Sequence, residues 1–182
     1  MKMLKKLLAV VLTGAMALTL LTACGGNAVT EKDIADAMND MAKAAEEDIT
    51  FTPRAKEREM AKAIAALSDE DLKELEEYLK NSSLPEKAKE ILGINAGGAN
   101  ANNFVWCGAT YTDELGTSGQ ALNFMTQVMD KSANADKLRG KNPADDRYMG
   151  TALCKMPDED GKLVTVRIIV VTAKAEEDKD KD

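Results

Sequence analysis

The chain has 182 residues, with 24 lysines and arginines against 31 aspartates and glutamates, and it contains no histidine. The acidic balance disfavours nucleic acid as a partner, because the phosphate backbone repels negative charge. The lack of histidine excludes Ser-His-Asp and Cys-His nucleophile systems and histidine acid–base catalysis, and it removes a common ligand of catalytic zinc. We therefore expect no cofactor.

The beginning of the chain has the layout of a secretory signal. Three lysines in MKMLKK precede an apolar run over residues 7–21. A helix over this run would rise about 22 Å, which is short of the roughly 30 Å hydrocarbon core of a bilayer. Small residues then lead to Cys24, as at a cleavage site. The alternative is an uncleaved membrane anchor in which Cys24 has no role.

The four residues Leu21, Thr22, Ala23 and Cys24 resemble the lipobox of bacterial lipoproteins. In that family the signal is cut just before the cysteine, and a diacylglycerol is attached to its thiol. The resemblance implies a signal peptide over 1–23 and a lipid on Cys24. It also implies that the protein is held on a membrane by this lipid and lies outside the cytoplasm.

Cleavage would make the mature chain more acidic and would leave two other cysteines. The signal contains three of the 24 basic side chains and no acid, so 21 basic side chains would face 31 acidic ones, a net charge near −10. Outside the reducing cytosol, Cys107 and Cys154 are candidates for one disulfide if their Cα atoms lie within about 7 Å. The alternative is two buried free thiols. We expect no metal site, since two cysteines without histidine do not supply the four ligands of zinc.

After a flexible tether over 24–30, the periodicity of residues 31–93 predicts about four helices. The first helix begins at a capping box formed by Thr30 and Asp33. The later helices begin at polar caps, and the last ends at a glycine. These positions are Thr52 followed by Pro53, Ser68, Ser83 with Glu86, and the terminal Gly93.

A linker or loop over 94–103 separates this helical segment from an α+β segment over 104–173. The pattern in the second segment predicts a strand, a helix, the loop NPADDR, and two strands joined as a hairpin by PDEDG. The run IIVV at 168–171 is apolar at every position, which predicts a central strand covered on both faces. The charged end, 174–182, reads as a solvated tail. The predicted fold class is α+β with a three-stranded, mostly antiparallel sheet.

The second segment is similar in element order to the CAP superfamily of cysteine-rich secretory, antigen 5 and pathogenesis-related-1 proteins. The likeness includes the strand YMGTAL at 148–153. The sequence CGATY stands where that family has a Gly-Glu-Asn motif, and the family's cleft histidines are absent. The resemblance therefore implies a degenerate domain without the family's metal site, and we transfer no site residue.

These features favour an envelope lipoprotein with a small non-catalytic domain that binds a partner protein or a small-molecule ligand. A binding site of this kind needs a cleft of about 300 Å³ or more. An alternative is a structural protein that docks on another envelope protein through an exposed apolar patch on its helices. A further alternative is an enzyme in which carboxylates such as Asp145, Asp146 or Glu114 converge in a cleft.

Overall fold

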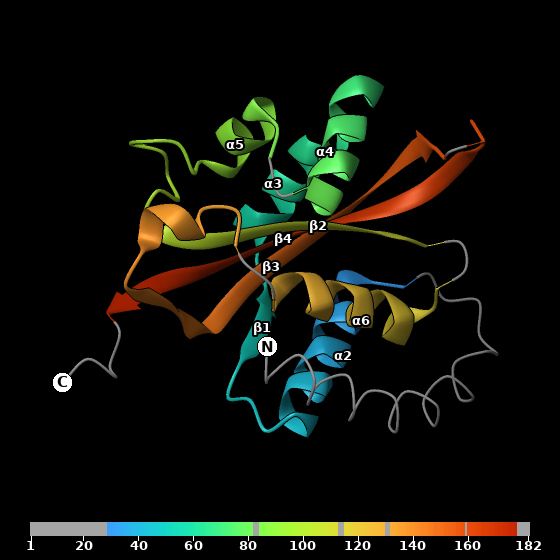
Figure 1. The fold of residues 1–182 in the computed structure, drawn as a ribbon. Helices are drawn as coiled ribbons and strands as arrows, with labels where there is room; N and C mark the ends of the chain where they lie inside the picture. Colours follow the sequence, from blue (N-terminus) through green and yellow to red (C-terminus); the bar gives the residue numbers. More distant parts are fainter. Residues whose placement is uncertain (1–28, 82–83, 113–114, 130–131, 159, 178–182) are drawn as a thin grey trace.

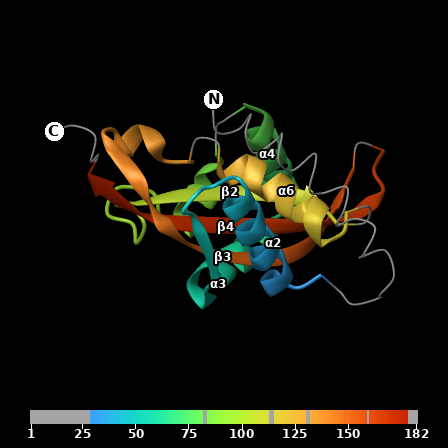
Figure 2. The ribbon, with the colours of Figure 1, turned by 90° about the horizontal axis from the view of Figure 1, so that it is seen from below.

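A mixed four-stranded sheet lies at the centre of the fold, with helices on both of its faces (Figures 1 and 2). The computed structural model describes residues 29–81, 84–112, 115–129, 132–158 and 160–177. The strand order is β1-β3-β4-β2, and β1 runs parallel to β3 while the other neighbours are antiparallel. No helix within these ranges is long and apolar enough to cross a membrane.

The described residues confirm an α+β fold but correct the predicted sheet, which has four strands of mixed direction rather than three mostly antiparallel ones. The helices are α2 (Glu31–Ala44), α3 (Ala55–Ala65), α4 (Asp69–Asn81), α5 (Glu86–Leu92), α6 (Thr117–Val128) and the short 3-10 helix η1 (Ala135–Leu138). The strands are β1 (Thr50–Pro53), β2 (Asn103–Tyr111), β3 (Lys141–Pro157) and β4 (Leu163–Glu177).

The additional strand, β1, occupies residues that the sequence pattern assigns to a helix cap. Thr52 and Pro53 pair with β3 in parallel register instead of starting a helix. Helix α3 begins only at Ala55, and its N-cap residue, Arg54, makes no side-chain cap hydrogen bond. The strand is stabilised by tertiary contacts, because Phe51 at its centre is buried in the core.

The other helix boundaries follow their predicted caps where these are described. Thr30 and Asp33 form a complete capping box at the start of α2. The Ser68 hydroxyl accepts a hydrogen bond from the backbone N–H of Asp71 at the start of α4. Gly93 ends α5 in the left-handed region, with φ of 64°. The predicted cap at Ser83 lies outside the described residues.

Strands β3 and β4 are longer than their sequence patterns predict. The predicted loop NPADDR forms the first part of β3, with a register shift between Pro143 and Arg147. Such a bulge bends a strand and interrupts the regular alternation of its side chains, which hides the strand from a periodicity argument. Lys174–Glu177, predicted as part of the tail, continue β4. The predicted hairpin is confirmed, since Pro157 pairs with Leu163.

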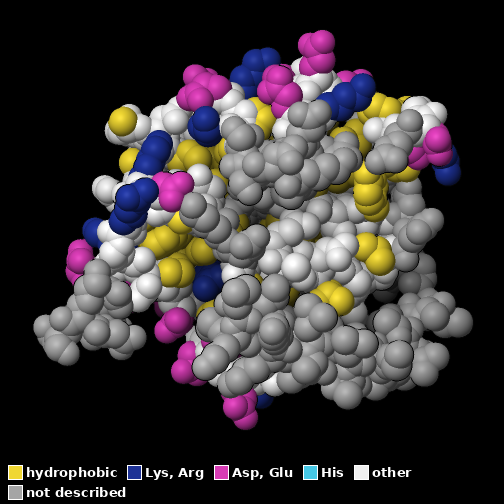
Figure 3. All heavy atoms as spheres, viewed as in Figure 1, with side chains coloured by type: hydrophobic (Ala, Val, Ile, Leu, Met, Phe, Trp, Pro, Cys, Tyr) yellow, Lys and Arg dark blue, Asp and Glu magenta, His cyan; other side chains and the backbone are white. Residues whose placement is uncertain are grey.

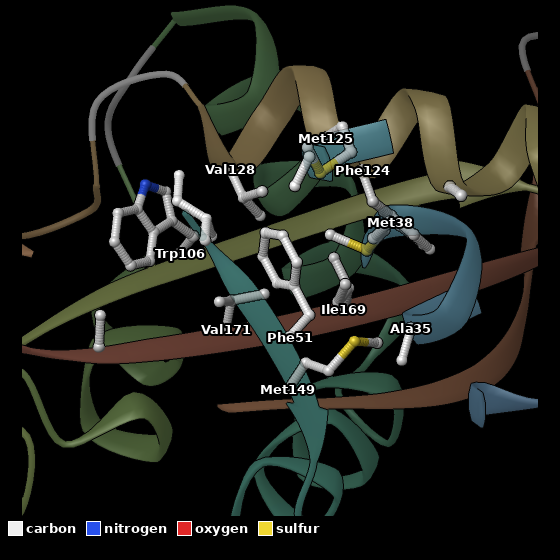
Figure 4. Close-up of a cluster of buried hydrophobic side chains, with 14 of the residues drawn as sticks. Ala35, Met38, Phe51, Trp106, Phe124, Met125, Val128, Met149, Ile169 and Val171 are labelled. Atoms are coloured by element: carbon white, nitrogen blue, oxygen red, sulfur yellow. The ribbon is translucent and has the colours of Figure 1, made fainter. Parts of the chain in front are cut away.

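Each face of the sheet supports its own hydrophobic core. On one face, α2 and α6 cover a cluster that includes Phe51, Trp106, Phe124 and Met149 (Figure 4). On the other face, α3, α4 and α5 cover a cluster of aliphatic side chains. Strand β4 contributes alternate residues of IIVV to the two clusters, which confirms that it is a central strand with both faces covered.

Residues from the helical segment and from the α+β segment share both cores. The closest approach between the segments is at Gly150 of β3, where an added Cβ would lie 2.0 Å from the backbone nitrogen of Arg58 in α3. Only a glycine at this position allows the helix to lie directly on the strand. The packing of α3 on β3 fixes the polar groups described below.

Candidate functional site

The two cysteines expected to pair are held apart as free thiols, and this corrects the disulfide prediction. Cys107 on β2 and Cys154 on β3 both lie beside β4, which separates them. Two strand spacings amount to about 9.6 Å, which exceeds the Cα separation that a disulfide can bridge. Burial raises the pKa of Cys107 to about 12 and raises the pKa of Cys154 as well, so neither thiol is activated as a nucleophile. Cys24 lies outside the described residues.

The carboxylates considered for catalysis do not converge among the described residues. Asp145 and Asp146 are exposed at the bulged part of β3. Asp146 accepts a hydrogen bond of 3.0 Å from the exposed Thr50 hydroxyl of β1. Glu114 lies outside the described residues. Asp145 and Asp146 therefore form no enclosed acid–base pair of the kind a carboxylate enzyme needs.

The most buried carboxylate among the described side chains belongs to Glu57 of α3, which the sequence pattern did not single out. Its side chain is fully buried and is bound by the guanidinium of Arg54 and by the Thr172 hydroxyl at 2.7 Å. Burial alone would raise the pKa of Glu57, but the hydrogen bonds from Arg54 and Thr172 outweigh it, and the pKa is lowered. The guanidinium of Arg54 also lies 3.7 Å from the centre of the Tyr148 ring. This ionised network joins α3 to the sheet and presents no reactive group.

Arg147 is a second buried charge that sequence reasoning missed. Its guanidinium carbon lies 4.9 Å from the centre of the Trp106 ring and 5.8 Å from that of Phe51. Its Nη1 donates to the carbonyl of Val128 at 3.2 Å, whereas Nε has no partner among the described residues. Burial lowers the pKa of Arg147 to about 10. Contacts with ring faces and a carbonyl, rather than an enclosed ion pair, hold this cation.

One hollow of the described surface lies where α2 ends and β1 begins. Its volume is about 500 Å³, which exceeds the predicted minimum, but it is shallow and open to solvent. Its wall is formed by the end of α2, the following loop and the start of β1, and it includes the exposed Glu46 and Asp48, so it does not enclose a ligand as small-molecule sites do. The lining residues are Asn39, Lys43, Glu46, Glu47, Asp48, Ile49 and Thr50.

Side-chain amides cap the outer edge of β2 at Asn103, Val105 and Ala109. The amide of Asn134 donates to the carbonyl of Asn103 at 2.7 Å and accepts from the N–H of Val105 at 3.2 Å. The amide of Gln127 in α6 makes the same pair of bonds with Ala109, at 2.9 Å and 3.0 Å. The backbone N–H of Ala133 adds a bond of 2.8 Å to Val105. These groups satisfy edge N–H and C=O groups that would otherwise pair with another strand.

The outer edge of β1 is sealed in the same way. The amide of Asn39 in α2 donates to the carbonyl of Phe51 at 3.0 Å and accepts from its N–H at 2.6 Å. Beyond the end of β1, the carboxylate of Glu31 accepts from the N–H of Thr151 at 2.7 Å, and Arg58 holds Glu31 in place. Each of these caps comes from a helix on the sheet.

The edge of β3 from Ala152 to Pro157 has no such cap among the described residues. Because outward groups alternate along a strand, the outward N–H of Thr151 implies that the N–H groups of Leu153 and Lys155 also point away from β4. Pro157 has no N–H and ends this stretch. Within the part of the chain that the structure describes, the hairpin therefore presents a short row of backbone groups without a partner, which is a template for one further strand.

Among the side chains that the structure describes, the most exposed large apolar ones lie at the same end of the sheet. Leu153 on β3 is 54% exposed, Leu163 on β4 is 64% exposed and Tyr111 on β2 is 47% exposed. The docking alternative placed an apolar patch on the first four helices, but these three side chains lie on strands. Acidic and basic side chains are interspersed over the helices at the top of the face shown in Figure 3. The exposed apolar groups and the open backbone edge therefore coincide at the β3–β4 hairpin.

Comparisons of the chain with protein-family models, curated proteins and solved structures give no match. Among the described residues, no group of three or more cysteine or carboxylate side chains could hold a metal ion. The geometry of the sheet edges and the sequence around Cys24 thus provide the basis for a functional proposal.

Proposed function

We propose that this chain is an exported, lipid-anchored lipoprotein of the cell envelope whose domain binds an extended segment of a partner protein along the open edge of β3. The observation that carries the binding role is the contrast between the sealed edges of β1 and β2 and the uncapped stretch from Ala152 to Pro157. A peptide strand added there gains backbone hydrogen bonds, and neighbouring side chains select its sequence.

The sequence supports the anchoring role. The lipobox-like residues end at Cys24, and the described residues begin at Val29, so a lipid on the cysteine would hold the domain close to a membrane. A single acyl chain binds membranes only weakly, whereas the two chains of a diacylglycerol give stable attachment. The acidic mature chain needs such an anchor, because it has no excess of basic charge to attract anionic lipids.

The anchor is tested by replacing Cys24 with alanine in a bacterial host that processes lipoproteins. We expect Cys24→Ala to leave an uncleaved precursor that incorporates no labelled fatty acid. Cys154→Ala is the matched control, and it should be cleaved and labelled like the unaltered chain. Unchanged cleavage and labelling of Cys24→Ala would contradict the lipid anchor.

The edge is tested with a photo-reactive amino acid at Leu153 in the full chain, cross-linked in intact cells. Lys155→Pro removes one outward N–H without removing a bond to β4, and Lys155→Thr removes the same charge but keeps the N–H. We expect one defined protein adduct that Lys155→Pro reduces roughly tenfold, since it loses a hydrogen bond and gains a steric clash worth about 1.4 kcal/mol together. Lys155→Thr should retain the adduct.

Two results would contradict binding at this edge. The first is the absence of any protein adduct both at Leu153 and at Ala152, which faces the opposite side of the sheet, in cells where the chain is processed and labelled at Cys24. The second is an adduct of equal yield in Lys155→Pro and Lys155→Thr. Binding would then not depend on the backbone N–H of residue 155, so the partner would not be paired with the strand.

A further inference from the structure

The first described residues are fixed beside the base of the β3–β4 hairpin. The guanidinium of Arg167 on β4 donates to the carbonyl of Val29 at 2.8 Å. The same guanidinium is held by Gln120 of α6 at 2.8 Å and by the Thr151 hydroxyl of β3 at 3.3 Å. Arg167 is only 7% exposed, so this junction is part of the packed fold. Val29 is therefore a fixed point from which the distance to Cys24 can be limited.

The chain between Cys24 and Val29 is short. The five residue steps from Cys24 to Val29 span at most about 18 Å when fully extended. A lipid on Cys24 would thus hold the Arg167 junction within about 18 Å of the acyl chains. The part of the surface that surrounds this junction is the part that such an anchor turns toward the membrane.

The surface around the junction is the face of the hairpin that exposes Leu153 and Leu163. Leu153 is the direct cross-strand partner of Arg167. Leu163 precedes Arg167 by four residues on the same strand, so it lies on the same face about 13 Å away. The separations of Leu153 and Leu163 from Arg167 are therefore both shorter than the roughly 18 Å that the chain from Cys24 to Val29 can span. In Figures 1 and 2 the start of α2 and the hairpin lie toward the same end of the sheet, opposite the end of β4.

We propose that the β3–β4 hairpin rests on the lipid surface through Leu153 and Leu163 when Cys24 carries its lipid. This inference rests on the proposed lipid anchor. The exposed Lys155 and Lys162 flank the leucines, while Asp160 adds an exposed negative charge at the turn, so the contact depends on apolar burial rather than on net charge. The outer edge of β3 then runs along the membrane, and a bound segment lies parallel to the lipid surface.

The orientation is tested by tryptophan quenching in the purified lipoprotein, reconstituted into phosphatidylcholine vesicles with or without brominated acyl chains. The only native tryptophan, Trp106, is buried at 5% exposure and gives the same background in every variant. Leu163→Trp places a reporter on the hairpin. Lys141→Trp places the matched control at the start of β3, at the other end of the same hairpin and roughly 50 Å away.

We expect brominated lipid to reduce the added emission of Leu163→Trp at least about twofold, since an interfacial contact inserts apolar groups to acyl-chain depth. The added emission of Lys141→Trp should not change. Leu153→Trp is the second reporter on the same face, and it should be quenched like Leu163→Trp. Circular dichroism identifies any variant that does not fold, and the remaining reporter then decides the result.

Mass analysis of the N-terminal peptide separates the possible failures. If Cys24 carries no diacylglycerol, both the anchor and this orientation are wrong. If Cys24 is lipidated and the hairpin reporters are quenched no more than Lys141→Trp, the orientation alone is wrong. A blue shift of Leu163→Trp that depends on protein concentration without lipid would show that a second copy covers the hairpin, and this would also overturn the inference.

Discussion

Replacing Glu57 with glutamine should destabilise the fold by about 2 kcal/mol at neutral pH. The fully buried carboxylate accepts two hydrogen bonds from Arg54 and one from Thr172. Glutamine keeps the volume of the side chain but turns an amide N–H₂ toward donors, so at least one buried donor loses its acceptor. The cost lies below that of a fully buried ion pair because Arg54 is 39% exposed and water can replace part of its bonding.

The same substitution should remove part of the acid sensitivity of the protein. The pKa of Glu57 is lowered in the folded state. Its contribution to the free energy of unfolding is therefore fully present above the ordinary pKa of 4.5 and is lost as the pH falls through the pKa of the folded state. Urea unfolding followed by circular dichroism at about pH 7 and about pH 4 measures both effects. The unaltered chain should lose more free energy of unfolding on acidification than Glu57→Gln.

Glu59→Gln provides the matched control on the same helix. Glu59 is 68% exposed and pairs only with Lys62, so its substitution should change the free energy of unfolding by less than about 0.5 kcal/mol. The reasoning would be refuted if Glu57→Gln cost no more than Glu59→Gln. It would also be refuted if Glu57→Gln and the unaltered chain lost equal stability on acidification.

Three other features, a close approach, a helix cap and a pair of thiols, give predictions that equilibrium unfolding or mass analysis can check. Gly150→Ala should cost at least about 2 kcal/mol, because its Cβ would collide with the α3 backbone, whereas Gly116→Ala, with open space around it, should cost less than about 1 kcal/mol, from placing alanine at the N-cap of α6. Thr30→Ala should cost about 1 kcal/mol through loss of the capping box, and a cost near zero would contradict the cap. Cys107 and Cys154 should both alkylate after denaturation without reductant, with Cys107 protected in the native protein, and an intact mass two hydrogens lower would contradict the free thiols.

Local signals predicted the parts of the fold that depend on local interactions. The capping box of Thr30, the cap at Ser68 and the glycine stop at Gly93 each act within a few residues, and each is formed. Strand β1 has no comparable local signal, since a four-residue segment ending in proline becomes a strand only by pairing with a distant part of β3. The first part of β3 was missed for a different reason, because its bulge breaks the two-residue alternation that identifies a strand.

The candidate site depends even more on tertiary structure. Cys107 and Cys154 lie on the same face of the sheet, but the sequence does not specify that β4 lies between their strands. Asn39, Gln127 and Asn134 look like ordinary polar surface residues in sequence, and their sealing role appears only when the strand edges are in place. The exposure of Leu153 also depends on tertiary structure, because a strand residue is exposed only where no helix covers it.

The unequal treatment of the sheet edges also limits how copies of this protein can assemble. An open-ended assembly formed by sheet pairing needs two unpaired strand edges on every molecule, one for each of its two neighbours. Here the amide of Asn39 closes the side of β1 and the amides of Gln127 and Asn134 close the side of β2. At the hairpin, β3 keeps an uncapped edge among the described residues, and pairing of two copies through this edge alone gives a closed, symmetric pair. The same arrangement that leaves the hairpin edge available for a partner thus disfavours fibre growth through the capped edges of β1 and β2.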